Sequence, residues 1–224
     1  MHKYDVIKKC NASGLGNIVV YADDILLIAR SCCNLQKLLD IVQDELVYLN
    51  LILNAQKCSC LRIGPRYKAP CAHLTCLDGT EISWVKQFRY LGIFIVSGRD
   101  FRCSADEAKR KFNRAANSIF GKLLGPASEE LIIHLLKVKC LPIVLYGSEA
   151  CDFTKATLHS LDFSVVRFGM KLFRTNNRQT VIDCFQYFRL ELPTAAISQR
   201  KMKFLAKFAN IDNALCRYVA ALAL

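Results

Sequence analysis

The chain has 224 residues, of which 53% are hydrophobic, so it is long enough to bury a core in one or two domains. Its 31 basic and 19 acidic residues give a formal charge of +12, which favours polyanionic partners. The sequence lacks both an uninterrupted apolar run of roughly 18 residues and the apolar core of a secretory signal, which predicts a cytoplasmic or nuclear protein without a membrane partner.

The first predicted elements are two strands that flank a pair of acids. Residues 18–20 and 25–28 are apolar and rich in β-branched side chains, which is typical of buried strands, and Asp23 and Asp24 lie between them at the tip of a hairpin. Two carboxylates held together in a part-buried place repel one another, so they require cations or shifted pKa values. Mg²⁺ prefers carboxylate and phosphate oxygens, and the pattern therefore points to two-metal phosphoryl or nucleotidyl transfer.

The alternative is a simple turn. Aspartate is common in turns because its side chain bonds to its own backbone, and a lone Asp-Asp turn is more often a turn than a metal site. The sequence downstream of the hairpin decides between these readings.

Residues 35–49 follow as an amphipathic helix, with Asn34 as the expected N-cap. Beyond it we expect a short strand at 61–63, a hairpin over 74–83 with a type I′ turn at Asp78-Gly79, and a strand from Phe88 to Val96. The rest of the chain is predicted to be helical. One helix ends at Gly125-Pro126, Ser128 caps the next, which Pro142 kinks or ends, and further helices cover 158–173 and the residues from Thr194 onward.

These elements predict the α+β class, with a mixed region at 1–97 and an all-helical region at 98–224. Two clusters of basic residues lie on the predicted helices and can face the backbone of a nucleic-acid duplex. They are Lys109, Arg110, Lys111 and Arg114, and then Arg200, Lys201, Lys203 and Lys207.

Twelve cysteines occur in a chain with no secretory signal, which indicates free thiols rather than a disulfide framework. One group could supply soft zinc ligands: Cys58, Cys60, Cys71, His73 and Cys76. Its spacings match no common zinc motif well, and alternation along a strand would instead place Cys58 and Cys60 on one face as small core residues.

Five segments, in this order, resemble blocks of the reverse transcriptases of non-LTR (LINE-like) retrotransposons: 20–29 (VYADDILLIA), 35–42 (LQKLLDIV), 51–58 (LILNAQKC), 88–93 (FRYLGI) and 142–149 (PIVLYGSE). The resemblance implies that 1–97 is the C-terminal part of a polymerase palm and that 98–224 is a thumb-like helical bundle. It also implies RNA-directed DNA polymerase chemistry with Mg²⁺, an RNA template and a DNA primer.

Residue by residue, the resemblance implies that Asp23 and Asp24 form the catalytic metal site and that Lys57 neutralises or protonates pyrophosphate. For Lys57 the alternative is a solvated surface lysine. Tyr21 would either pack below the hairpin, which the sequence favours, or lie near the primer. The primer end would be held by residues of one hairpin: Phe88, Arg89, Tyr90, Leu91 and Gly92.

The chain departs from the family where a second carboxylate strand and the nucleotide-binding fingers should precede the hairpin. Asp5 is the sole acid before Tyr21, and it resembles a helical segment rather than the missing ligand. We therefore expect a fragment that is inactive alone. The alternatives are a non-catalytic module that binds RNA or RNA–DNA hybrid, and a fragment that assembles with an intact polymerase, or with the missing palm and fingers segments, through an exposed sheet edge.

Overall fold

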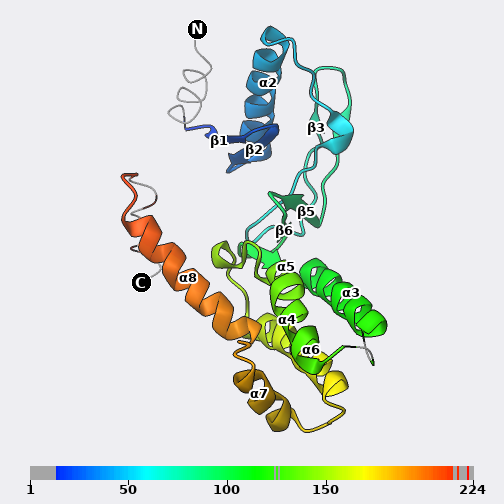
Figure 1. Cartoon of the computed structure of the whole chain (residues 1–224). Helices are drawn as coiled ribbons and strands as arrows, with labels where there is room; N and C mark the ends of the chain where they lie inside the picture. The colour runs from blue at the N-terminus through cyan, green and yellow to red at the C-terminus, as the bar shows by residue number, and fades with distance from the viewer. Residues whose placement is uncertain (1–13, 124, 126, 214–215, 217–220, 222–224) are drawn as a thin grey trace. The chain divides into compact units, whose positions relative to one another are not determined.

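The computed structural model describes residues 14–123, 125, 127–213, 216 and 221 (Figure 1). The chain folds as two compact units. The first unit comprises Met1–Phe88 with Val96–Phe101, and the second comprises Arg89–Ile95 with Arg102–Leu224. The predicted α+β class is confirmed, because small antiparallel sheets in the N-terminal part are followed by helices. The functional boundary at residue 97 stays a prediction, and Asp5 lies outside the described residues.

The first unit begins with the predicted hairpin. Strand β1 (Gly16–Tyr21) pairs antiparallel with β2 (Asp24–Ala29), from Gly16 opposite Ala29 to Tyr21 opposite Asp24. Helix α2 (Cys32–Tyr48) follows and packs on the hairpin, where Ile18, Leu38 and Val42 form a small core. Its N-cap is Ser31, whose Oγ accepts from the Asn34 amide at 3.2 Å, so the prediction of Asn34 as the cap is wrong by three residues.

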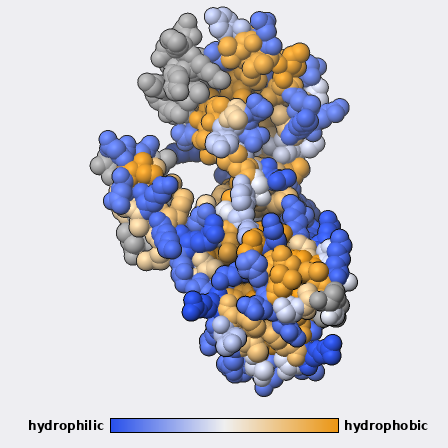
Figure 2. Space-filling model, viewed as in Figure 1, coloured by the Kyte–Doolittle hydropathy of each residue, from blue (hydrophilic) through white to orange (hydrophobic). Residues whose placement is uncertain are grey.

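The prediction that both hairpin strands are buried is wrong. In β1 only Ile18 is buried, and Val19 and Ile28 are 45% and 50% exposed. Continuous apolar strands are buried on both faces of a complete sheet, but the described residues cover only the face that meets α2. Further apolar side chains are exposed where α2 ends, among them Val47, Leu51 and Ile52, and Figure 2 shows hydrophobic residues gathered over this part of the first unit.

Beyond α2 the first unit is mostly irregular. A short 3₁₀ turn, η1 (Ala55–Lys57), precedes the two-residue strands β3 (Leu74–Thr75) and β4 (Glu81–Ile82). The predicted strand at 61–63 is wrong, because this segment is joined to its neighbours by isolated bridges at Cys60 and Ile63. The hairpin of β3 and β4 is confirmed, but its turn is longer than predicted: the Cys76 amide donates to the Thr80 carbonyl, and only Gly79 has a positive φ, of 81°.

A three-stranded sheet has the order β5 (Gln87–Tyr90), β6 (Ile93–Val96) and β7 (Arg102–Ser104). The expected strand from Phe88 to Val96 is therefore a hairpin, because Leu91 and Gly92 turn the chain with φ values of 47° and 86°. Positive φ at both central residues is the signature of a type I′ turn.

The second unit is built from helices that share one core. They are α3 (Asp106–Leu123), α4 (Glu129–Leu135), α5 (Leu141–Leu145), α6 (Lys155–Leu172), α7 (Arg178–Tyr187) and α8 (Pro193–Ala209). Phe112, Leu136, Val165 and Phe185 lie at the centre of this core, each at most 2% exposed. Helix α7 was not predicted from the sequence.

The sequence predicts that Pro142 kinks or ends its helix, and in the structure the helix does not end there. The π-helical segment η2 (Leu136–Cys140) lies between α4 and α5, and Pro142 falls in the first turn of α5. A proline lacks the amide donor and crowds the preceding turn, and a π-helical turn relieves both problems. Within the resulting stretch Glu129–Ala150, an apolar window has a mean hydropathy of 1.6 and suits a membrane span by length and composition, although core helices of soluble proteins pass the same test and 39% of that window is buried here.

Gly169 allows α6 and α7 to approach closely, and it provides a test of the helical packing. A Cβ at this position would lie 2.5 Å from side-chain atoms of both Val181 and Phe185, which are buried. We expect Gly169→Ala to lower the free energy of unfolding by about 1–3 kcal/mol, despite the higher helix propensity of alanine. Gly121→Ala is the matched control on α3, because nothing lies within 4 Å of that Cβ.

The control should raise the free energy of unfolding by roughly 0.5–1 kcal/mol, as expected for an open helical position. Urea unfolding of the two variants measures both effects. Equal stabilisation by both alanines would contradict the packing of α7 on α6.

Candidate metal and nucleic-acid site

The two acids lie at the tip of the β1–β2 hairpin. Asp24 is the first residue of β2 opposite Tyr21, and Ala22 and Asp23 form the two-residue turn between the strands. Ala22 has a φ of 50°, in the left-handed region that residues with a Cβ rarely adopt. Such strained turns are held by the surrounding structure, and here α2 supports the hairpin from one face.

Both carboxylates are exposed, so the expectation of a part-buried pair is not met. The donor set nevertheless suits Mg²⁺, which binds proteins through one or two carboxylates and completes its octahedron with water and substrate phosphates. Within the described ranges no group of three or more His, Cys, Asp or Glu residues is placed to hold a metal. The hairpin therefore offers one side of a metal site, open to solvent.

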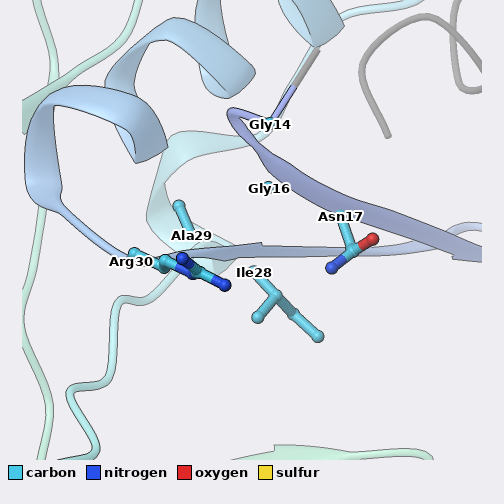
Figure 3. A pocket seen from close by; sticks show the side chains of 6 residues that line it. All are labelled: Gly14, Gly16, Asn17, Ile28, Ala29 and Arg30. Atoms are coloured by element: carbon cyan, nitrogen blue, oxygen red, sulfur yellow. The ribbon is translucent and has the colours of Figure 1, made fainter. Parts of the chain in front are cut away.

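Tyr21 is 63% exposed, so the favoured interpretation of this residue as a packing residue below the hairpin is wrong. Its ring is accessible beside the acids. At the other end of the hairpin, a cavity of about 370 Å³ is lined by Gly16, Asn17, Ile28 and neighbouring residues (Figure 3). A Cβ at Gly16 would overlap the carbonyl oxygen of Ile28, which explains the glycine there. This cavity lies at the base of the hairpin and does not include the acids.

Lys57 is exposed at the end of η1. The Oδ1 atom of Asn54 accepts a hydrogen bond from the Lys57 amide at 3.3 Å, so Asn54 caps this turn and fixes the backbone from which the lysine projects. The role of Lys57 in catalysis stays a prediction.

The predicted primer-binding residues occupy β5 and the turn after it. Phe88 and Tyr90 are half-buried, whereas Arg89 between them is exposed. In the second unit, the Tyr146 hydroxyl donates to the Leu91 carbonyl oxygen at 3.2 Å, and a Cβ on Gly92 would come within 2.6 Å of the Tyr146 ring. Two motifs identified separately in the sequence, 88–93 and 142–149, therefore contact each other.

The basic residues on α3 and α8 differ in what they contact. On α3, Lys109 donates to the Ser160 hydroxyl at 2.6 Å and Arg110 pairs with Glu107 at 2.6 Å, while Lys111 and Arg114 are exposed. On α8, Arg200 lies 3.6 Å from Glu149 and Lys201 lies 3.1 Å from Asp152. These two pairs join α8 to the segment around η3 (Ser148–Ala150), whereas Lys203 and Lys207 are exposed.

The thiols of the first unit gather near one another. Cys32 and Cys71 are 3.4 Å apart at sulfur, and an Arg62 nitrogen lies 2.9 Å from the Cys71 sulfur. His73 contacts a carboxylate: its Nδ1 atom lies 3.4 Å from Oε2 of Glu81. Cys60 and Cys76 are buried with Leu39, Leu74 and Ile82, as expected of small core residues.

The reactivity of the Cys60 thiol provides a test of its described burial. Burial, with a smaller contribution from the nearby thiol of Cys58, raises the pKa of the Cys60 thiol from 9.0 to about 12. Because the thiolate is the reacting form, we expect iodoacetamide to leave Cys60 unmodified in the native chain at pH 8. Exposed Cys33 is the control and should be modified in the same sample.

In urea both residues should react, as mass spectrometry of tryptic peptides would show. The raised pKa also means that the fold retains a proton that the unfolded chain releases. This contribution to stability is complete below pH 9 and is lost as the pH rises toward about 12. Native labelling of Cys60 at the rate of Cys33 would contradict the described burial.

Comparison with known proteins bears directly on the hairpin. Residues 4–95 match the family model described as reverse transcriptase (RNA-dependent DNA polymerase). This part of the chain is therefore similar to reverse transcriptases. The chain is also 35% identical over 103 residues to the retrovirus-related Pol polyprotein from type-2 retrotransposable element R2DM of Drosophila melanogaster.

That alignment covers 42% of this chain and 10% of the fly protein, so the chain spans about a tenth of the relative's length. No solved structure matches the chain significantly. The resemblance to a fragment of a non-LTR retrotransposon reverse transcriptase is confirmed, and the matched residues include β1, β2, α2 and most of the β5–β6 hairpin.

Proposed function

We propose that the chain is a segment of an RNA-directed DNA polymerase from a non-LTR retrotransposon, and that its Asp23-Asp24 tip holds Mg²⁺ for nucleotidyl transfer. The single observation that carries this proposal is the exposed acid pair at the turn of β1 and β2, inside the region that matches the reverse transcriptase model. Mg²⁺, when bound, would activate the attacking hydroxyl and neutralise the leaving pyrophosphate.

The residues of the chain have distinct roles in this proposal. Asp23 ligates the metal, and Asp24 adds negative charge beside it. Exposed Lys57 faces the pyrophosphate, and the hairpin residues Phe88 to Gly92 hold the primer end. The basic second unit binds the template–primer duplex through phosphates, which positions the duplex without reading its sequence.

We further propose that this chain alone does not extend a primer. Among the described residues the site has two carboxylates from one turn and no third acid placed with them. A metal held so loosely is poorly positioned, and a misplacement of about 1 Å costs on the order of a hundredfold in rate.

A primer-extension assay with a homopolymer RNA template, a DNA primer and Mg²⁺ tests this proposal. We expect the unmodified chain to incorporate no more nucleotide than the Asp23→Ala variant. Robust incorporation that Asp23→Ala abolishes would show that the chain is a complete polymerase and would overturn the claim of inactivity.

The second candidate is a non-catalytic module that binds RNA or RNA–DNA hybrid. The exposure of both tip carboxylates and the surplus of basic residues favour it. Such a module should bind duplex RNA equally well in Mg²⁺ and in EDTA at matched ionic strength, with a steep dependence on salt. Binding that requires Mg²⁺ and is lost in Asp23→Ala would favour the polymerase segment instead.

A further inference from the structure

A groove of about 260 Å³ separates helices α3 and α6 of the second unit. Lys109, Asn113 and Asn117 line it from α3, and Phe163, Arg167 and Lys171 line it from α6. Within each set the residues are four positions apart, so each set forms one stripe along its helix. The hydrogen bond from Lys109 to Ser160, at 2.6 Å, joins the two helices beside the groove.

The chemistry of the groove suits an anionic chain. Its stripes supply three cations and two amide side chains, and none of the described residues that line it is acidic. Arg167 and Lys171 are exposed, and no carboxylate among the described residues forms an ion pair with either. Phe163, which is 53% exposed, adds one apolar wall. Cations that no carboxylate neutralises are available to phosphate groups.

Two of the four basic residues in the α8 cluster contrast with those of this groove. Arg200 and Lys201 already contact Glu149 and Asp152, so binding a phosphate there would first have to break contacts that hold α8 in place. Net charge alone therefore does not distinguish the α8 cluster from the α3–α6 groove. The difference lies in the ion pairs of Arg200 and Lys201, which Arg167 and Lys171 lack among the described residues.

We propose that the α3–α6 groove binds the sugar-phosphate backbone of a nucleic-acid strand, with Arg167 and Lys171 as its main phosphate ligands. The amides of Asn113 and Asn117 donate to phosphate or sugar oxygens, and Phe163 packs against the sugar. The inference rests on the proposed function and adds to it a site on α6. Because the contacts go to the backbone, the binding is independent of base sequence.

Fluorescence anisotropy of a labelled RNA hairpin, titrated with the full chain at several salt concentrations, tests the proposal. We expect Arg167→Ala/Lys171→Ala to weaken binding roughly 10- to 100-fold near 0.1 M salt. The slope of log K against log salt should become shallower by about 1.4–1.8, the value for two lost phosphate contacts. Circular dichroism and thermal unfolding verify that the variant is folded.

The matched control is Lys122→Ala/Lys155→Ala, which removes the same charge from exposed positions of the same two helices outside the groove. It should bind within about twofold of the unmodified chain. If both double variants bind alike, the groove is not the site and the inference is wrong, although the proposed function stands. If the unmodified chain binds no RNA or DNA at any salt concentration, the proposed nucleic-acid function of the second unit also fails.

Discussion

Replacing Phe112 by alanine is expected to lower the free energy of unfolding of the second unit by about 3–5 kcal/mol, the usual cost of a large cavity in a rigid core. Phe112 is fully buried on α3 among residues of the shared helical core. Because native domains are stable by only about 5–15 kcal/mol, this loss would remove a large share of the stability of the unit.

Phe163→Ala is the control, since this phenylalanine is on α6 of the same unit but is 53% exposed. It should change stability by less than about 1 kcal/mol. Chemical unfolding followed by far-ultraviolet circular dichroism measures both variants. A similar cost for the two would mean that the helices do not share the described core.

The second large effect is expected at Gly92, where the Leu91-Gly92 turn meets Tyr146. Alanine here would adopt an unfavourable φ of 86° and would displace a ring whose nearest atom is 2.6 Å from the new methyl group. Moving that ring breaks the 3.2 Å hydrogen bond from Tyr146 to Leu91. We expect Gly92→Ala to cost about 2–3 kcal/mol, the sum of a dihedral cost and a lost hydrogen bond.

Gly79→Ala separates these two costs. Gly79 has a similar φ, 81°, but nothing lies within 4 Å of its Cβ position, so its replacement should cost only about 1–2 kcal/mol. In a Tyr146→Ala background, Gly92→Ala should cost no more than Gly79→Ala, because the ring is absent. Thermal unfolding of the four variants completes the cycle, and an unchanged cost of Gly92→Ala in that background would refute the contact.

The local parts of the fold were accessible from the sequence. The two apolar runs around Asp23-Asp24 form the predicted hairpin, and helical spacing placed α2, α3 and α6 within a few residues of their observed ends. Helix α7 was missed because only Val181 and Phe185 are buried on it, too few for a clear stripe. Asn177, which caps α7 by accepting from the Gln179 and Thr180 amides, was the available signal.

The parts that were not accessible depend on tertiary contacts. The sequence showed that α3 and α8 are basic, but it could not show that Arg200 and Lys201 pair with acids far along the chain. It also gave no reason to single out Arg167 and Lys171, which matter because α6 places them opposite the α3 stripe. The sequence overestimated the burial of the β1–β2 hairpin. Apolar runs of this kind are buried when a complete sheet is covered on both faces, whereas the described residues cover only one face of this hairpin.

The central claim is that the tip of β1 and β2 binds a divalent metal, and paramagnetic broadening of amide resonances by Mn²⁺ tests it most directly. We expect broadening centred on Ala22, Asp23 and Asp24 at low Mn²⁺ concentrations, and we expect it to disappear in Asp23→Asn/Asp24→Asn. Asp78→Asn, which removes an exposed acid from another hairpin turn, should leave it unchanged. Broadening that is no stronger at the tip than around Asp78, or that persists when both tip carboxylates are replaced, would contradict the claim.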